Sequence, residues 1–197
     1  MIEYIRGAIT ALNPTSATLE TGSGVAYMLN ISLPTYSALQ GVADTKLYVH
    51  ESIREDAWTL YGFTDELERE HFRNLIGVSG VGAATAMLIL SALQGDELAA
   101  VITGGDVKRL KAIKGIGAKT AERIIIDLRD KIKAADDTLL SQLSAPTAVP
   151  AAFDEALAAL IMLGFDKKAS NKALKALFDA DPTLKVEAAI KKALSMM

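Results

Sequence analysis

The chain has 197 residues and a formal net charge of −3; half of its residues are apolar and 23% are charged, a composition that excludes wholesale disorder. Because it contains no cysteine, disulfide scaffolds, thiolate metal sites and cysteine nucleophiles are excluded as well. No apolar run is long enough to span a membrane and the N-terminus lacks the pattern of a signal peptide, so we expect a cytoplasmic protein with no membrane partner.

The first part of the chain has the pattern of β-strands. Apolar and β-branched residues alternate with polar ones, and turn signals recur, for example at Asn13-Pro14 and Gly41. Five short strands in this length favour an OB-type β-barrel over residues 1–64, with a helical turn over Pro34 to Leu39. The expected strands lie near 2–12, 16–21, 24–32, 45–52 and 57–62.

From Thr64 the apolar period becomes helical, with Thr64 as the expected N-cap and acidic residues over the first turns. Helices are expected to about Lys133, within an all-α domain over residues 65–143. Residues 144–152 are small, uncharged and interrupted by Pro146 and Pro150, which predicts a flexible linker. The whole is then an α+β multidomain chain.

Residues 153–197 return to helical spacing and are expected to form a three-helix bundle. Within it, Leu163-Gly164-Phe165 has the pattern of a helix C-terminus, with Gly164 as the left-handed cap. Such a small unit is near the lower size limit for independent stability. It therefore favours a module that docks on a partner.

An internal repeat dominates the middle of the chain. The segment from Leu75 to Ile89 reappears 35 residues later, from Leu110 to Ile124, with seven identical positions. A duplicated unit of helix, Gly-apolar-Gly turn and helix explains this match. The identical pairs are Leu75/Leu110, Gly80/Gly115, Gly82/Gly117, Ala83/Ala118, Thr85/Thr120, Ala86/Ala121 and Ile89/Ile124.

The repeat predicts anion binding. Glycines permit a sharp turn, and the helix that follows directs its unpaired N–H groups and its positive dipole end outward. Val81 and Ile116, between the glycines, are expected to be buried. A phosphate bound by backbone N–H groups is recognised without regard to base, which predicts structure-selective, sequence-independent DNA binding. A simple helix-joining turn is the alternative for each hairpin.

Positive charge is concentrated at the second hairpin. Between Gly105 and Arg123 there are six basic and two acidic residues, a net +4. Lys114, Lys119 and Arg123 are therefore expected to contact phosphates, although a solvated helix face is the alternative.

Together these features resemble the RuvA family of Holliday junction branch-migration subunits over essentially the full chain. The resemblance rests on Arg54-Glu55-Asp56, Leu60-Tyr61-Gly62-Phe63, the turn Gly80-Val81-Gly82, and the run from Gly115 to Arg123. It implies a non-catalytic, cofactor-free homotetramer that binds four-way junction DNA in recombination and repair. The implied DNA-binding residues are Ser79, Gly80, Val81, Gly82, Lys114, Gly115, Ile116, Gly117, Lys119, Thr120 and Arg123.

The resemblance also implies partners. The terminal bundle would recruit the ring-shaped ATPase RuvB, which must hydrolyse the ATP because this chain has no phosphate-binding loop. The RuvC junction nuclease is a further candidate partner. The candidate partner-binding residues are Leu157, Leu160, Ile161, Leu174 and Leu177, for most of which burial in the bundle core is the favoured use.

Glu55 and Asp56 fall at the expected turn between the last two strands. On charge alone the pair repels phosphate, and from sequence alone an ordinary exposed turn is favoured. The resemblance implies instead an acidic pin at the junction centre, which guides separating strands. A metal-dependent nuclease needs further acids that are not evident nearby, so we expect no metal site.

One departure from the family concerns the first hairpin. Many relatives have Pro-Lys after Gly-Val-Gly, whereas this chain has Ala83-Ala84. We therefore expect this hairpin to rely on backbone N–H groups and Ser79, and to contribute less to salt-dependent affinity than the second.

Three further residues carry weaker expectations. His50 and His71 are expected at surface positions of a strand and a helix rather than in a metal site. Trp58 is assigned either to barrel packing or to a position near a base. Two other functions stay open: a helix-hairpin-helix DNA-repair enzyme subunit, and an RNA-binding accessory protein of translation.

Overall fold

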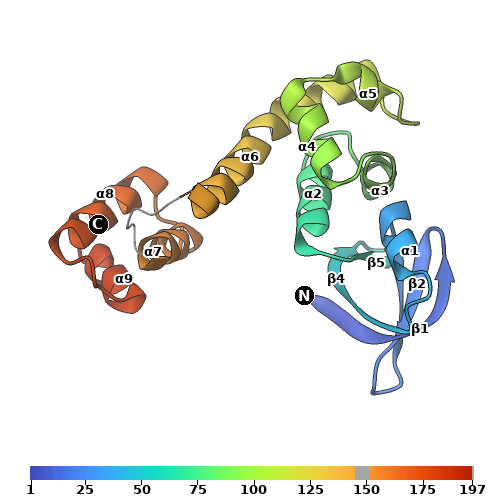
Figure 1. The fold of residues 1–197 in the computed structure, drawn as a ribbon, viewed down its shortest axis with the longest axis horizontal. Helices are drawn as coiled ribbons and strands as arrows, with labels where there is room; N and C mark the ends of the chain where they lie inside the picture. The colour runs from blue at the N-terminus through green and yellow to red at the C-terminus, as the bar shows by residue number, and fades with distance from the viewer. Residues whose placement is uncertain (145–150, 197) are drawn as a thin grey trace. The chain divides into compact units, whose positions relative to one another are not determined.

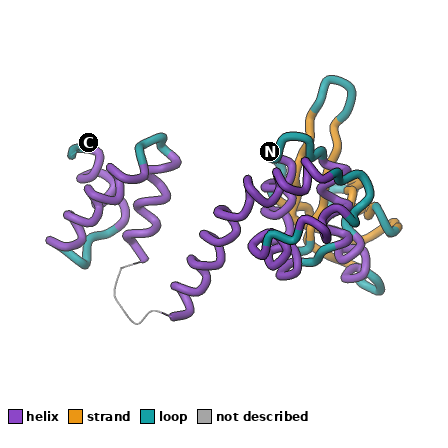
Figure 2. The backbone as a smooth tube through the Cα atoms, turned by 90° about the horizontal axis from the view of Figure 1, so that it is seen from above, coloured by secondary structure: helices purple, strands orange, loops and turns teal. Residues whose placement is uncertain are grey.

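The computed structural model describes the backbone of residues 1–144 and 151–196, and the side chains of residues 1–132 and 152–196. The chain divides into two compact units, Met1–Leu139 and Leu140–Met197, whose elements are drawn in Figure 1. Figure 2 shows strands and helices in the first unit and helices alone in the described part of the second. The predicted fold class, a barrel followed by a helical region and terminal helices, is confirmed.

The N-terminal part of the first unit is a closed five-stranded barrel with the strand order β1-β2-β3-β5-β4. β3 and β5 pair in parallel, and the other neighbours pair antiparallel. Each strand starts and ends within two residues of the expectation. The bounds are β1 Tyr4–Asn13, β2 Ser16–Glu20, β3 Ala26–Ile31, β4 Asp44–Ile53 and β5 Trp58–Phe63.

Alternation along the strands fills the barrel. Leu47 and Val49 of β4, and Leu19 of β2, are fully buried, while their strand neighbours face outward or are half-buried. The short helix α1, Leu33–Leu39, lies between β3 and β4 and adds Leu39 to the same core. Its N-cap, Ser32, accepts a hydrogen bond from the Thr35 N–H at 3.2 Å.

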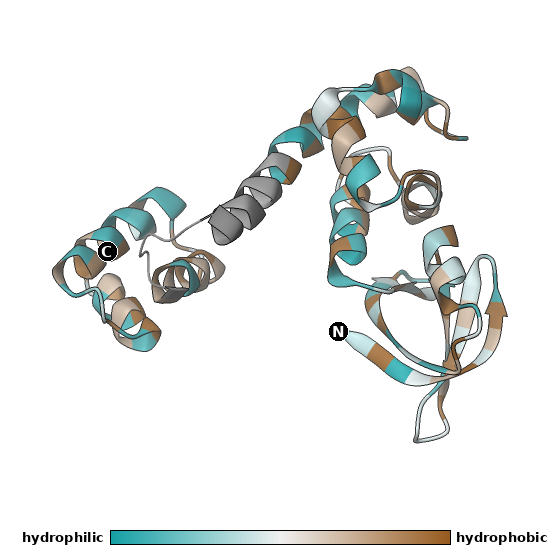
Figure 3. Ribbon diagram, in the orientation of Figure 1, coloured by the Kyte–Doolittle hydropathy of each residue, from teal (hydrophilic) through white to brown (hydrophobic). Residues whose placement is uncertain are grey.

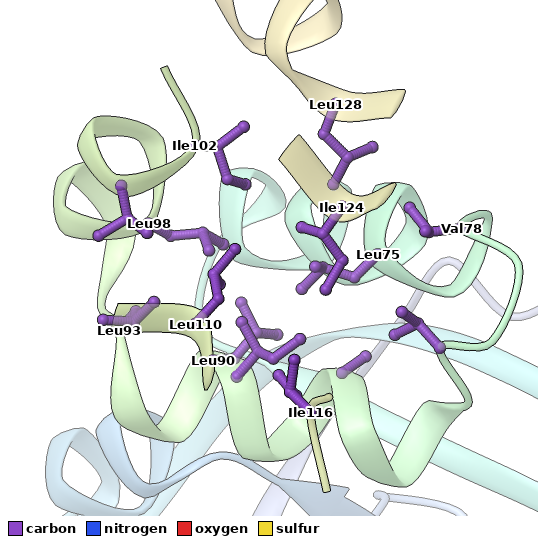
Figure 4. Close-up of a cluster of buried hydrophobic side chains, with 14 of the residues drawn as sticks. Leu75, Val78, Leu90, Leu93, Leu98, Ile102, Leu110, Ile116, Ile124 and Leu128 are labelled. Carbon is purple, nitrogen blue, oxygen red and sulfur yellow. The ribbon is translucent and has the colours of Figure 1, made fainter. Parts of the chain in front are cut away.

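Five further helices follow the barrel, and the last of them extends past Leu139, where the first unit ends. They are α2 Glu66–Ile76, α3 Ala83–Ala92, α4 Gly95–Gly104, α5 Val107–Lys111 and α6 Ala118–Ser144. Their buried side chains converge on one core, in which Leu75, Leu110 and Ile124 are fully buried (Figure 4). These three residues belong to the identical pairs of the repeat, so the duplication preserves a packed helical core.

Two expectations for these helices are wrong. Asp65, not Thr64, is the N-cap of α2: its carboxylate accepts from the Glu68 N–H at 2.7 Å, and its charge faces the positive end of the helix. α6 continues to Ser144 instead of ending near Lys133. The extra residues include Ala, Leu and Gln, which favour helix, and the first proline is Pro146.

Side chains of α2 fix the helices to the barrel and to α1. Glu68 of α2 accepts hydrogen bonds from the hydroxyls of Ser32 and Thr35, at 2.5 and 2.9 Å. Arg69 is almost fully buried and donates to the Glu3 carboxylate at 2.5 Å. In addition, Phe63 of β5 packs on Phe72 of α2, with ring centroids 5.1 Å apart. The barrel and the hairpin helices therefore belong to one compact unit.

The second unit consists, in its described part beyond α6, of α7 Ala151–Met162, α8 Lys167–Ala180 and α9 Val186–Leu194. Leu160, Leu174 and Phe178 lie in its core, while α8 is coloured mostly as hydrophilic in Figure 3. Gly164 has φ +91°, and the Phe165 N–H donates to the Leu160 carbonyl at 3.1 Å, which confirms the expected cap.

The predicted linker falls largely outside the described residues, because 145–150 are not described. At its two ends, Ser144 belongs to α6 and α7 already begins at Ala151, two residues before the expected start of the bundle.

No single helix of the described chain is long and apolar enough to cross a membrane. Together α3 and α4 have the required length and composition, but their axes differ by 102° at the break. Ala86, Ile89, Leu98 and Ile102 of this pair are buried in the helical core, which accounts for its apolar composition.

Candidate DNA-binding interface

The two hairpins have closely similar turns. The Val81 N–H donates to the Val78 carbonyl at 3.0 Å, and the Ile116 N–H donates to the Ile113 carbonyl at 3.1 Å. Gly80 and Gly115 have φ values of +92° and +90°, a region that disfavours any residue with a Cβ. The first glycine of each pair therefore makes the turn possible.

Val81 and Ile116 are 5% and 6% exposed, so their expected burial in the core is confirmed. Their backbone N–H groups, however, are donated within the turns, so these two of the implied DNA-binding residues do not present a free N–H group to a phosphate. In a four-residue turn with this hydrogen bond, the N–H of the last residue closes the turn. The unpaired donors therefore lie further along, at the helix N-termini.

The second glycine of each pair precedes a helix. Gly82 is the N-cap of α3 and has no side-chain cap, and Gly117 comes directly before α6. The first intrahelical bonds run from the Ala86 N–H to Gly82 and from the Ala121 N–H to Gly117. The N–H groups before Ala86 and Ala121 thus have no partner in their own helices.

These helix N-termini are open to approach. Gly82 and Gly117 are exposed, and a Cβ built on either would have nothing within 4 Å. The absent side chains leave room in front of unpaired donors at the positive ends of two helix dipoles. Such an arrangement binds anions such as phosphate.

One hollow of about 450 Å³ joins the two hairpins. The turn of the first hairpin contributes Ser79 and Gly80, and α6, after the second hairpin, contributes the rest. Across it, Arg123 donates from Nη1 to the Ser79 carbonyl at 3.4 Å. The structure thus brings five predicted residues together, and the lining comprises Ser79, Gly80, Lys119, Thr120, Glu122, Arg123, Ile126 and Asp127.

A second hollow of about 520 Å³ is related to the first by the repeat. Here the turn of the second hairpin contributes Ile113 and Lys114, and α3, after the first hairpin, contributes Leu88 and Ser91. Each turn therefore lies beside the helix that follows the other hairpin. Lys114 is accordingly separated from the other predicted cations.

The two hollows differ in charge. Leu88 occupies the position in the repeat that Arg123 occupies 35 residues later, and Ala84 corresponds to Lys119. The second hollow obtains its cations from Lys114 and from Arg109, and Arg109 is ion-paired with Glu97. The first hollow also has two cations, Lys119 and Arg123, but there they lie beside two acidic residues, Glu122 and Asp127.

Three residues of the first hollow were not predicted: Glu122, Ile126 and Asp127. They share one side of α6 with Lys119 and Arg123, at helical spacing. That spacing was a signal in the sequence that would have found them. Ile126 is 74% exposed, so this side of α6 also presents apolar surface.

The predicted acidic pair lies at the tip of the hairpin between β4 and β5. Glu55 and Asp56 are exposed, and the Arg54 N–H closes the loop on the Ala57 carbonyl at 2.8 Å. Among the described residues, no group of three or more acidic, histidine or cysteine side chains is arranged to hold a metal ion. The tip therefore presents carboxylates with no neighbouring set of ligands.

The two histidines are less exposed than expected. His71 is 7% exposed on α2, and His50 of β4 is half-buried, with its ring 5.2 Å from that of Phe72. Burial, reinforced by Arg73 and Arg69, lowers the pKa of His50 below its ordinary value. Both residues lie where the barrel meets α2, so the expectation of surface positions is wrong.

The candidate partner-binding residues of the second unit differ in how deeply they are buried. Leu160 and Leu174 are fully buried, and Leu157 and Leu177 pack partly against the same core. Leu160 and Leu174 fill the bundle core, which is the use that the sequence favoured for most of these residues. Ile161 is 40% exposed.

Sequence reasoning missed strongly exposed apolar residues in the described part of this unit. Met162 and Leu163 are 88% and 61% exposed, and Phe165 is partly exposed. They follow Ile161 where α7 ends and the chain turns into α8. The expected helix cap at Gly164 was the signal in the sequence that could have identified them, because residues around a helix cap lie outside the bundle core.

A closed OB-type barrel joined to tandem helix-hairpin-helix units with open helix N-termini defines a class of nucleic-acid-binding proteins. The matched families agree: RuvA N terminal domain over residues 1–62, SAM-like helix-hairpin-helix tandem over 72–130, and RuvA C-terminal domain over 151–197.

Full-length relatives give the family. The chain is 48% identical to a protein of Bacteroides fragilis and 49% identical to one of Parabacteroides distasonis, each over 100% of both chains. A Porphyromonas gingivalis protein is 48% identical over the same full coverage. All three are named Holliday junction branch migration complex subunit RuvA. The present chain belongs to the RuvA family.

Proposed function

We propose that this chain binds four-way junction DNA as a structure-specific, sequence-independent subunit of a branch-migration complex. The observation that supports this most is the first hollow, where Ser79 and Gly80 of one hairpin meet Lys119, Thr120 and Arg123 of the other. Backbone N–H groups and cations recognise phosphates, which every sequence presents equally. The names of the full-length relatives supply the four-way geometry.

The proposed binding set follows the two hairpins. Helix N-termini after Gly82 and Gly117 donate to phosphates, while Arg123 and Lys119 add charge in the first hollow. Lys114 contributes from the second hollow. The first hairpin, with Ala83-Ala84, contributes mainly through N–H groups and is therefore less dependent on salt.

We further propose a homotetramer in which Glu55 and Asp56 of each subunit form an acidic pin at the junction centre. The exposed position of these carboxylates at a hairpin tip supports the proposal. Four such tips near one point would repel backbone phosphates, and so direct the strands apart. This assembly carries no catalytic group or cofactor of its own.

In this proposal each part of the chain has its own function. Residues 1–64 carry the pin, residues 65–143 hold DNA, residues 144–152 link, and residues 153–197 dock on the RuvB ATPase ring in the cytoplasm. The exposed apolar residues from Ile161 to Phe165 suit a protein contact. RuvB would supply the ATP hydrolysis, and the RuvC nuclease would share the junction.

A competition gel shift tests the proposal. The labelled probe is a four-way junction, and the competitors are linear duplexes with the sequences of its arms and unlabelled junctions of unrelated sequence. The proposal requires that either junction competes and that duplex competes poorly. Equal competition by duplex, or discrimination between the two junction sequences, would contradict it.

A further inference from the structure

The hairpin between β4 and β5 exposes an apolar pair immediately below its acidic tip. Ile53 and Trp58 are directly opposed across the two strands, and they are 72% and 64% exposed. Trp58 is the single tryptophan of the chain. Its exposure removes barrel packing as its role.

The position of the pair explains its exposure. Along β5, Trp58 falls on the same side as Leu60, which is buried in the barrel core. The same alternation places Ile53 of β4 on the side of Val49. The pair lies beyond the end of that core, and opposed side chains on neighbouring strands lie close together. The result is an apolar surface on an otherwise polar hairpin tip.

The negative charge beside this apolar surface determines which part of a DNA strand can bind there. Glu55 and Asp56 lie within three residues of Trp58 and are exposed, as is Arg54. The tip thus has two carboxylates and one cation, a net charge of −1, which repels phosphates. A nucleobase carries no net charge and has a flat π-face, which stacks on an aromatic ring whatever the base. A DNA strand approaching the tip is therefore favoured to present a base rather than its backbone.

We propose that Trp58, flanked by Ile53, is a stacking site for an unpaired nucleobase at the crossover. This inference rests on the proposed function, because a base becomes available for stacking only where strands leave their duplexes. Duplex DNA keeps its bases stacked inside. The acidic carboxylates and the indole thus act together: the former exclude the phosphates of the exchanging strand, and the latter binds its base.

The intrinsic fluorescence of Trp58 tests the site in the full-length protein. Stacking of a base on the indole quenches its emission. We expect quenching on addition of a four-way junction, weaker quenching by a single-stranded oligothymidine, and none by linear duplex at the same degree of binding. A parallel gel shift on each sample measures whether the DNA is bound.

Variants make the test specific. Trp58→Ala should weaken junction binding about tenfold, and Trp58→Phe should restore most of the affinity because it keeps an aromatic face. Val42→Ala is the matched control: Val42 is also an exposed apolar residue, at 40%, but it precedes β4, at the opposite end of that strand from the acidic tip. It should bind the junction as the wild type does.

The outcomes separate the two proposals. Junction binding with unchanged Trp58 emission, or an unaffected Trp58→Ala variant, would overturn the stacking site and leave the proposed function standing. Emission that changes with protein concentration in the absence of DNA would assign the surface to a second copy of the chain and would also overturn it. Failure to bind the junction in the gel shift would reject the proposed function itself.

Discussion

Arg123 connects the two hairpins: its Nη1 donates to the backbone carbonyl of Ser79, 44 residues earlier in the chain and 3.4 Å away. One side chain of α6 thus contacts the turn of the first hairpin while its charge lines the hollow between them. The hydrogen bond to the Ser79 carbonyl uses only one of the guanidinium N–H groups of Arg123, so the others can donate to further acceptors. Arg123 is therefore placed both to position the first turn and to contact a phosphate.

Replacing Arg123 should lower the affinity for DNA and also make that affinity less dependent on salt. Arg123→Gln removes one cation from the first hollow, so the slope of log affinity against log salt should become less steep by about one for each lost phosphate contact. Lys108→Gln removes the same charge from α5, outside both hollows. Fluorescence anisotropy across a salt series measures both variants, and identical slopes for the two would refute this role of Arg123.

The first glycine of each pair should matter for folding. Gly80 has φ +92°, and an alanine there should cost about 1 to 2 kcal/mol of unfolding free energy. Urea unfolding of Gly80→Ala measures the loss. Gly22→Ala is the comparison, since Gly22 has an ordinary φ and open space around its Cβ position. Equal stability of Gly80→Ala and the wild type would show that the turn relaxes.

Glu68 should hold the barrel and the hairpin helices together. Its two oxygens accept from Ser32 and Thr35, residues that are fully buried. Glu68→Ala leaves two buried hydroxyls without that acceptor and should destabilise the protein by about 2 to 4 kcal/mol. The neighbouring exposed residue Glu70 offers a control as Glu70→Ala. Similar urea midpoints for the two variants would contradict the assignment.

Stability should fall on acidification through His50. Burial, with Arg73 and Arg69, lowers the pKa of this imidazole in the folded state. The unfolded chain takes up the proton near pH 6.5, whereas the folded chain does so at lower pH, so the unfolded state binds more protons between these values. This contribution is complete above about pH 6.5 and is lost as the pH falls through that window.

Urea unfolding at pH 7.5 and pH 5.5 measures this effect, with His50→Gln as the comparison. His71 is present in both proteins, so its contribution cancels. The wild type should lose more stability between the two pH values than His50→Gln does. The same loss in both would exclude His50 as the origin.

The repeat made much of the helical region predictable from sequence. Identical apolar positions such as Leu75 and Leu110 are buried because both copies build the same local packing. The turn at Gly80 followed from the same local pattern. Structural features that depend on residues close together in the chain could therefore be predicted from the sequence.

Contacts between residues that are far apart in the chain could not be predicted in this way. Glu68 is one of the acidic residues that the sequence places over the first turns of a helix, yet its partners are Ser32 and Thr35, more than 30 residues earlier. Likewise, nothing local separates Lys114 from Lys119, although they line different hollows. Nor does the sequence show that the N–H groups of Val81 and Ile116 close the turns, because a turn hydrogen bond depends on backbone geometry, which a residue pattern specifies only in part.

The N-termini of α3 and α6 are the proposed phosphate-binding sites, and serine at their capping positions tests this role. In Gly82→Ser/Gly117→Ser, each hydroxyl can accept from its own helix N–H groups, so stability should be retained or slightly raised. The same side chains occupy the space before the donors, and junction affinity should fall by at least about tenfold, given about 1.5 to 3 kcal/mol for each charge-assisted hydrogen bond. A stable double variant that binds a four-way junction as tightly as the wild type would contradict phosphate binding at these helix N-termini.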